Sequence, residues 1–139
     1  MCGRFTRFTP VADIAKTFSA VASQVEIPPS FNIAPTQNVY VVQGGVSRDV
    51  KEVHWGLVPS WSDDISRASS MINARVETVR EKPSFRNLLS SHRCVIPING
   101  YYEWKQLPRV GKVRAKQPYY FSPSIESQYC HDGMLAIAS

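Results

Sequence analysis

The hydrophobic positions along the chain predict many strands and two short helices. The first helix is expected after Thr9-Pro10, which form a capped start, because the next apolar residues repeat at the spacing of one helix face. These residues are Val11, Ile14, Ala15 and Phe18. A second short helix is predicted over residues 83–89, which begin with a proline.

Strands are predicted where β-branched residues or alternating polarity dominate. Residues 38–43 and 50–55 flank Gly44-Gly45 and are expected to form a hairpin. Residues 106–117 are basic and contain helix and strand breakers, so an exposed hairpin loop is expected there. Four more strands are expected over residues 93–97, 100–105, 118–121 and 134–138.

Length and composition restrict the class of protein. A chain of 139 residues, 43% hydrophobic and 19% charged, has the size and composition of one folded domain over residues 1–139. No run approaches the roughly 18 apolar residues of a membrane span, and the first residues lack the core of a signal peptide. The three cysteines lack CxxC spacing. We therefore expect a cytoplasmic or nuclear protein with no membrane partner.

Positive charge is concentrated in the middle of the chain. Residues 66–116 contain eleven Lys and Arg and three Glu, whereas the net charge of the whole chain is +5. Aromatic residues lie in or near this segment: Trp55, Trp61, Tyr101, Tyr102 and Trp104. Cations interleaved with aromatic rings suit a phosphate backbone with stacked bases. The alternative is a solvated basic surface with its aromatic residues in the core.

Familiar catalytic motifs are absent, since the chain has no GxGxxG, Walker loop, HExxH or GxSxG. Its cysteines and histidines lack the close pairing of structural zinc sites, so no metal or other cofactor is expected. Cys94 lies in the apolar stretch 93–97 and is expected to be a small buried residue.

Cys2 has chemistry of its own if Met1 is removed, because it then has an α-amine and a thiol on adjacent carbons. An α-amine has a lower pKa than a lysine amine and can attack an aldehyde near neutral pH. The thiol can close on the resulting imine to give a five-membered thiazolidine, aided by proximity. The alternative is that Cys2 is an incidental residue of a first strand.

Two polar residues lie among positions that would otherwise pack. In a strand over residues 100–105, Glu103 shares a face with Tyr101 and Lys105. A carboxylate among aromatic residues could exchange protons near neutral pH, but Glu103 could instead form a salt bridge with Arg75 or Lys105. Asn73 could be functional, or an amide bonded to backbone in a turn or at a sheet edge.

Five segments together resemble the SRAP family, named for SOS-response-associated peptidase and also called abasic-site processing proteins. The match extends over the whole chain, and the segments occur in the family's order. They are Met1-Cys2-Gly3-Arg4-Phe5, Phe31-Asn32-Ile33-Ala34-Pro35-Thr36, Trp55-Gly56-Leu57-Val58-Pro59-Ser60-Trp61, Ile72-Asn73-Ala74-Arg75-Val76-Glu77-Thr78, and Arg93-Cys94-Val95-Ile96-Pro97 with Gly100-Tyr101-Tyr102-Glu103-Trp104.

The resemblance implies an α+β fold around a curved, barrel-like antiparallel sheet. It implies binding of single-stranded DNA with abasic sites and a covalent crosslink through Cys2. Asn73 would bond the sugar or the reacting amine, and Glu103 would move protons in imine formation and in any cleavage of the 3′ phosphate. The DNA-binding residues implied are Arg4 and Arg75 at phosphates and Pro35 and Trp61 in an apolar wedge. A monomer in the cytoplasm, associated with the nucleoid, or in the nucleus is expected.

One part of the family pattern is missing, because the family also uses a histidine in a His-Asp-Arg-Met-Pro type motif. His131-Asp132-Gly133-Met134 resembles this motif but precedes the last predicted strand, so its place in the order is wrong. We therefore expect the C-terminal third of the family domain to be absent. Two other functions remain open, which are self-processing by an N-terminal cysteine peptidase and noncovalent binding of single-stranded DNA.

Overall fold

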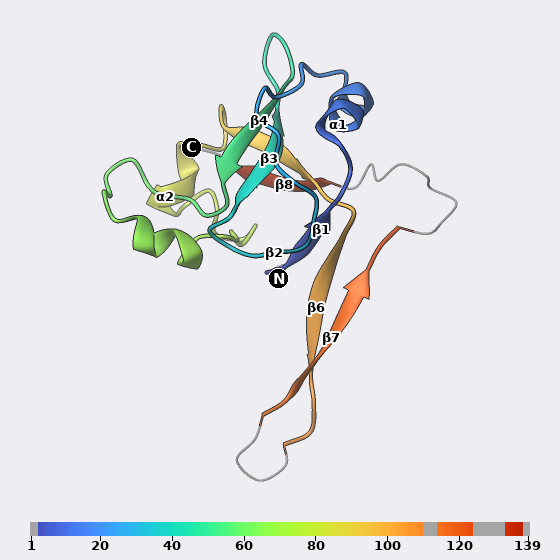
Figure 1. Ribbon diagram of the computed structural model, residues 1–139. Coiled ribbons are helices and arrows are strands. Elements are labelled where there is room, and N and C mark those ends of the chain that lie inside the picture. The colour runs from blue at the N-terminus through green and yellow to red at the C-terminus, as the bar shows by residue number, and fades with distance from the viewer. Residues whose placement is uncertain (1–2, 110–113, 124–132, 138–139) are drawn as a thin grey trace.

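The structure is a computed structural model that describes residues 3–109, 114–123 and 133–137. These residues form two four-stranded antiparallel sheets, with strand orders β2-β1-β6-β7 and β4-β3-β5-β8 (Figure 1). The strands of the first sheet are β1 (Phe5–Arg7), β2 (Ser30–Ile33), β6 (Gly100–Gln106) and β7 (Lys116–Phe121). Those of the second sheet are β3 (Asn38–Gln43), β4 (Asp49–His54), β5 (Arg93–Pro97) and β8 (Gly133–Ile137).

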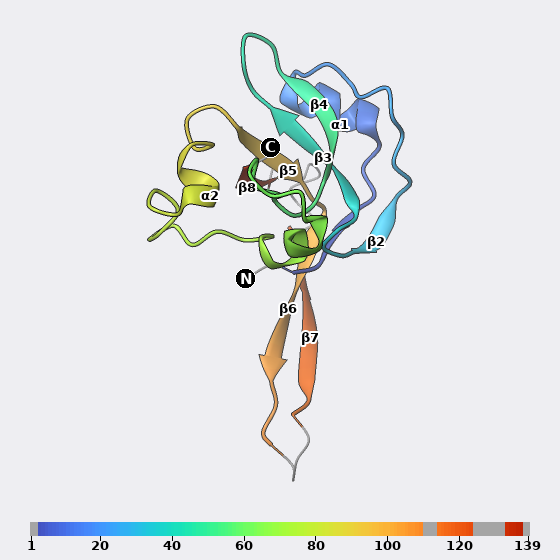
Figure 2. The ribbon, with the colours of Figure 1, turned by 90° about the vertical axis from the view of Figure 1, so that its left-hand side faces the viewer.

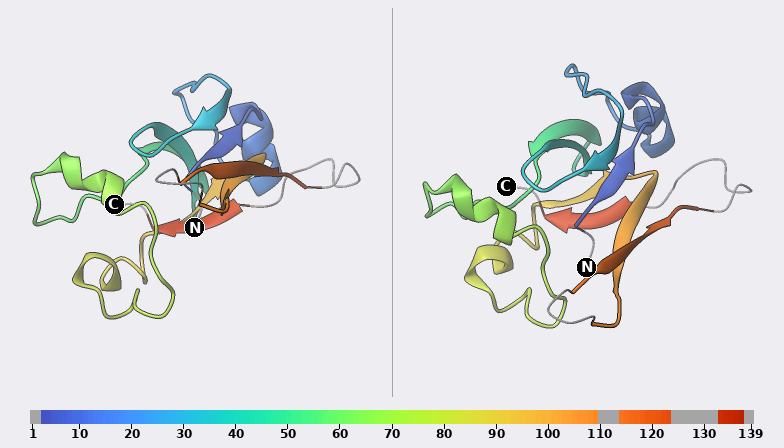
Figure 3. Two further views of the ribbon diagram at one scale, coloured as in Figure 1. Left: turned by 90° about the horizontal axis from the view of Figure 1, so that it is seen from below. Right: turned by 60° about the horizontal axis from the view of Figure 1, so that its bottom comes forward.

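The helices are few and short, as expected. They are α1 (Val11–Phe18), the 3-10 helix η1 (Ile65–Ser70) and α2 (Pro83–Arg86). Figures 1 and 3 show η1 and α2 on one side of the molecule and α1 on the other. No helix in the described ranges is long and apolar enough to cross a membrane.

Most predicted elements are confirmed. The periodicity after Pro10 gives α1, and the hairpin around Gly44-Gly45 is formed by β3 and β4 in a continuous register from Asn38↔His54 to Gln43↔Asp49. The later predicted strands correspond to β5, β6, β7 and β8. Strands β1 and β2 and helix η1 were not predicted, because each is too short for a clear periodicity.

The predicted α+β fold with antiparallel strands is confirmed, and among the described residues the strands form two sheets that no hydrogen-bonded strand pair closes into a barrel. Several details of the predicted elements are wrong. The hydroxyl of Thr9 does not cap α1, since it accepts a hydrogen bond from the side-chain amide of Asn99 (2.8 Å). Helix α2 ends at Arg86, and the predicted 106–117 loop is shortened because β6 extends to Gln106 and β7 begins at Lys116.

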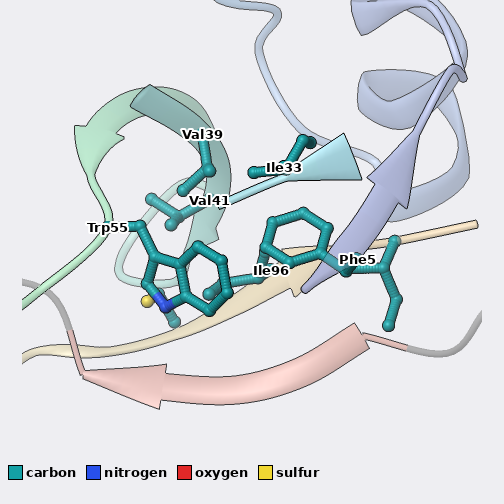
Figure 4. Packing of buried hydrophobic residues seen from close by; sticks show 8 residues of the cluster. Phe5, Ile33, Val39, Val41, Trp55 and Ile96 are labelled. Atoms are coloured by element: carbon teal, nitrogen blue, oxygen red, sulfur yellow. The ribbon is translucent and has the colours of Figure 1, made fainter. Parts of the chain in front are cut away.

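The main hydrophobic core lies between the two sheets (Figure 4). The rings of Phe5 and Trp55 are 4.9 Å apart, and both side chains are buried. Ile72 and Tyr101 are partly buried and pack against this cluster. Its other buried members are Ile33, Val39, Val41, Cys94, Ile96 and Ile98. Cys94 is 3% exposed, so the prediction of a small buried residue is confirmed.

A buried arginine holds the end of β1. The Arg7 guanidinium donates hydrogen bonds to the carbonyl oxygens of Ile27 (2.9 Å), Pro28 (2.6 Å) and Thr9 (3.3 Å), and lies 5.0 Å from the Tyr40 ring centroid. Burial lowers the pKa of Arg7, and the charge of Tyr40 acts in the opposite direction. The hydrogen bonds offset the desolvation of this cation and fix the chain before β2.

Candidate nucleic-acid site

The pairing of β1 with β6 brings Arg4 and Phe5 beside the strand that contains Glu103. Phe5 pairs with Tyr101, and the Tyr102 amide donates a hydrogen bond to the Arg4 carbonyl oxygen (2.9 Å). Paired residues of antiparallel strands point to the same face, and alternate residues of one strand share a face. The Glu103 side chain therefore lies on the face that Phe5 and Tyr101 turn toward the core, and it is partly buried.

Asn73 is exposed and lies beside a residue that packs against the same core. Its neighbour Ile72 packs against the cluster that contains Phe5 and Trp55. Asn73 also lines an open apolar pocket of about 580 Å³ between β3, β4, β5 and the segment 56–89. Segments that carry Arg4, Asn73 and Glu103 are thus anchored on one hydrophobic cluster although they are far apart in the sequence.

Arg4 has a partner that the sequence reasoning did not single out. Its guanidinium donates a hydrogen bond to the Asn32 side-chain oxygen on β2 (2.9 Å). The Tyr102 hydroxyl donates to the Phe31 carbonyl oxygen (3.0 Å), so β2 is also tied to β6. The only signal for Asn32 was its place inside the segment 31–36 of the family pattern. These contacts hold the Arg4 side chain at the edge of the first sheet.

The predicted wedge residues lie on two surface segments, of which the one with Pro35 is bonded to Trp55. Thr36, with φ of 73°, follows Pro35, and its amide donates to the Trp55 carbonyl oxygen (2.9 Å). Pro35 is partly buried, whereas Trp61 lies after β4 and is 62% exposed. Arg75 is exposed and begins the turn that follows Asn73, where its carbonyl oxygen accepts from the Thr78 and Val79 amides. The wedge and phosphate roles stay predictions.

The basic segment forms an exposed surface. Every Lys and Arg side chain of residues 66–116 that the structure describes is exposed to solvent. They are Arg75, Arg80, Lys82, Arg86, Arg93, Lys105, Arg109, Arg114 and Lys116. Exposed cations are available to a polyanion, as the nucleic-acid interpretation requires, although a solvated basic surface would look the same.

Two sequence candidates lie outside the described residues, namely Cys2 and His131. For the remaining candidates, the structure anchors the segments that contain Arg4, Asn73 and Glu103 on one core cluster, through Phe5, Ile72 and Tyr101. Among the residues that are described, no three His, Cys, Asp or Glu side chains are grouped so that they could hold a metal ion.

Comparison with known proteins gives a match over the whole chain. The family described as "SOS response associated peptidase (SRAP)" matches residues 1–139. The abasic site processing protein YoqW of Bacillus subtilis is 43% identical over 116 residues, which is 81% of this chain and 52% of that protein. The abasic site processing protein YoaM of the same bacterium is 37% identical over 142 residues, covering 96% of this chain and 63% of that protein.

More distant proteins share the framework. The abasic site processing protein HMCES of Pongo abelii is 30% identical over 153 residues, covering 92% of this chain and 42% of that protein. A crystal structure of a protein from Bacteroides thetaiotaomicron has a TM-score of 0.77 at 24% identity, covering 98% of this chain and 59% of the other. The latter supports the α+β fold alone. This chain spans between 42% and 63% of the length of these three curated relatives.

Proposed function

Because the chain belongs to the SRAP family, we propose that it recognises abasic sites in single-stranded DNA and forms a covalent crosslink to them through Cys2. Residues 1–139 would act as a single domain, and the crosslink would protect the lesion. The observation that supports this most directly is the anchoring of three segments, with Arg4, Asn73 and Glu103, on the Phe5–Trp55 cluster. The relatives named as abasic site processing proteins support the choice of lesion.

The chemistry requires a free amine and thiol on Cys2, so Met1 must first be removed. The ring-opened sugar of an abasic site exposes an aldehyde. The amine nitrogen forms a bond to the aldehyde carbon, and the carbinolamine then loses its oxygen as water to give an imine. The thiol sulfur adds to the imine carbon and its proton passes to nitrogen, which closes the thiazolidine.

The neighbouring residues support this chemistry in distinct ways. Cys2 is two residues before Arg4 in the sequence, and Phe5 pairs with Tyr101 on the strand that contains Glu103. Glu103 would take a proton from the attacking amine and return it to the leaving hydroxyl. Asn73 would donate a hydrogen bond to the sugar. Arg4 and Arg75 would bind phosphates, while Pro35 and Trp61 would separate the bases beside the lesion.

A strand-cleaving activity is a further part of the proposal. An imine at the sugar carbon acidifies the adjacent carbon, so removal of that proton by Glu103 would expel the 3′ phosphate by β-elimination. The family description as a peptidase favours a second candidate, in which Cys2 attacks an amide. Strand cleavage would release a shortened DNA, and peptidase activity would release a cleaved amide. Neither product is a stable crosslink.

The test is to incubate the protein lacking Met1 with single-stranded DNA that contains one abasic site. We expect a heat-stable species of the combined mass, absent with undamaged DNA. Cys2→Ala should abolish it, and Cys2→Ser should not restore it because an oxygen nucleophile is weaker. Crosslinking that survives Cys2→Ala, or that occurs while Met1 is retained, would disprove the proposal.

The same samples separate the alternatives. Peptidase activity would appear as cleavage of an amide without DNA. A noncovalent binding module would retain DNA in a complex that Cys2→Ala leaves intact and that added salt weakens.

A further inference from the structure

The β6–β7 hairpin extends away from the rest of the molecule (Figure 2). From Trp104 to Ile125 the sequence contains five Lys and Arg residues and no Asp or Glu. Four of these cations lie in the described part of the chain, and all four are exposed: Lys105, Arg109, Arg114 and Lys116. A projecting arm that contains cations and no carboxylate in its outer half attracts a polyanion.

The inner face of this hairpin, defined by Tyr101, Glu103, Lys105, Tyr119 and Phe121, continues the wall of the candidate site. Tyr119 pairs directly with Glu103, so the two side chains point to the same face with their Cβ atoms about 5 Å apart. The next row toward the core is the pair Tyr101–Phe121, whose stacked ring centroids are 5.3 Å apart. The next row outward contains Lys105. Aromatic rings, a carboxylate and a cation therefore follow one another along this face.

The Tyr119 ring is accessible where the hairpin meets the candidate site. Its side chain is 48% exposed, whereas Glu103 across from it is partly buried. An abasic residue has no base of its own, so a ring beside its sugar is open to the base of the neighbouring nucleotide. Bases stack on exposed aromatic rings whatever their sequence. The position and exposure of Tyr119 therefore suit a base that flanks the lesion.

Lys105 lies at a suitable spacing to bind a phosphate of the same strand. It is two residues beyond Glu103 on β6, which corresponds to about 7 Å along the strand. This distance is close to the length of one nucleotide in an extended single strand. A DNA strand with its abasic sugar at Glu103 would therefore bring a neighbouring phosphate to the Lys105 ammonium.

We propose that the inner face of the β6–β7 hairpin binds the nucleotide next to the abasic site. The Tyr119 ring stacks on the base of that nucleotide, and the Lys105 ammonium binds its phosphate. This inference rests on the proposed function, because it takes the abasic sugar to lie at Glu103. The partner is single-stranded DNA, whose bases are free to turn toward the ring.

The test measures DNA binding without crosslinking. The probe is a single-stranded DNA with one tetrahydrofuran residue, an abasic analogue that has no aldehyde, and fluorescence anisotropy reports its affinity. Tyr119→Leu should weaken binding by about fivefold or more, because a stacked base is lost, whereas Tyr119→Phe keeps the ring and should stay within about twofold. Trp104→Leu removes an exposed ring on the opposite face and, as the control, should also stay within about twofold.

A second DNA identifies the contact. It has tetrahydrofuran residues at the lesion and on both sides of it, so the flanking bases are absent. Tyr119→Leu should have no effect on the affinity for this DNA, because the base that the ring stacks on is gone. A loss of the same size with both DNAs, or no loss with either, would overturn the proposal.

The salt dependence of binding tests the phosphate contact. Lys105→Ala should lower the slope of log affinity against log salt concentration by the amount of about one phosphate contact. Lys16→Ala, a change at an exposed lysine of α1, is the control and should leave the slope unchanged. An unchanged slope for Lys105→Ala would overturn this part of the proposal.

These outcomes are distinct from failure of the proposed function. A protein that binds natural abasic DNA but forms no crosslink would refute the chemistry at Cys2, whereas the unreactive analogue would still report the contact with Tyr119. A Tyr119→Leu protein that keeps its DNA affinity but loses a dimer formed by the unchanged chain would assign this face to a protein partner and overturn the proposal.

Discussion

Gly100 should be intolerant of even a single methyl group, because β7 crosses directly over it. A Cβ at this position would lie 2.5 Å from Cζ of Tyr120 and 2.6 Å from the Phe121 carbonyl oxygen. Cβ atoms in real proteins essentially never come within 3.0 Å of other atoms. The Tyr120 ring could move only by breaking its 2.9 Å hydrogen bond to the Thr6 hydroxyl, and the Phe121 carbonyl can move only with β7 itself.

The expected cost of Gly100→Ala follows from these contacts. Overpacking of a well-packed site costs about 1 to 3 kcal/mol, and a lost hydrogen bond adds about 1 kcal/mol. We therefore expect the free energy of unfolding to fall by roughly 2 to 4 kcal/mol, which is a large share of the ~5 to 15 kcal/mol typical of a domain. The base of the hairpin that presents Glu103 should also loosen.

Urea unfolding followed by tryptophan fluorescence measures this change. The midpoint should fall by about 1 to 2 M, given typical urea slopes. Gly44→Ala is the matched control, since a Cβ there would meet no atom within 4 Å, and its midpoint should stay the same. Adding Tyr120→Ala to Gly100→Ala should cost less than the sum of the two single changes, because it removes the clash with the ring. A Gly100→Ala protein within about 0.5 kcal/mol of the unchanged protein would refute this reasoning.

Three further changes test the core and the proposed site. Arg7→Lys should lower the free energy of unfolding by about 2 to 3 kcal/mol, because an ammonium cannot replace the hydrogen bonds of the buried guanidinium. Urea unfolding measures this change, and an unchanged midpoint would contradict it. Glu103→Gln should slow crosslinking at least tenfold and leave DNA affinity nearly constant. Glu26→Gln, a change at an exposed glutamate, is the control and should alter neither. Equal losses of rate and affinity in Glu103→Gln would indicate a structural role. Arg75→Ala should weaken DNA binding and lower the slope of log affinity against log salt concentration by the amount of about one phosphate contact. Arg48→Ala in the β3–β4 turn should change neither. An unchanged slope for Arg75→Ala would exclude Arg75 from phosphate binding.

Local patterns predicted the elements whose residues all follow one periodicity. Helix α1 and the β3–β4 hairpin were recovered because their apolar residues define a single face and a short glycine turn. Strand β1 was not, because three residues define no periodicity, and its place in the sheet depends on pairing with β6 far away in the sequence. The predicted helix cap at Thr9 failed for the same reason, because its hydroxyl accepts a hydrogen bond from Asn99, which is far away in the sequence.

The candidate site was predicted as a set of residues but not as an arrangement. Asn73 and Glu103 stood out as polar residues within segments that otherwise pack. Asn32 was missed as a partner of Arg4, since nothing local distinguishes it from other strand asparagines. The segments of Asn73 and Glu103 meet because Ile72 and Tyr101 pack against the same hydrophobic cluster. Such packing depends on contacts between residues far apart in the sequence.

The sequence by itself determined the strand-rich character, the position of the basic segment and the membership of the family, because periodicity, charge and motifs are local properties of the chain. Only the tertiary structure decided that the strands form two separate sheets and that Arg4 lies beside the strand that contains Glu103. It also showed that Arg7 is buried and that the aromatic rings of β7 are about half exposed. Burial and strand pairing depend on which distant segments meet, and one hydrophobic cluster between the sheets fixes that choice.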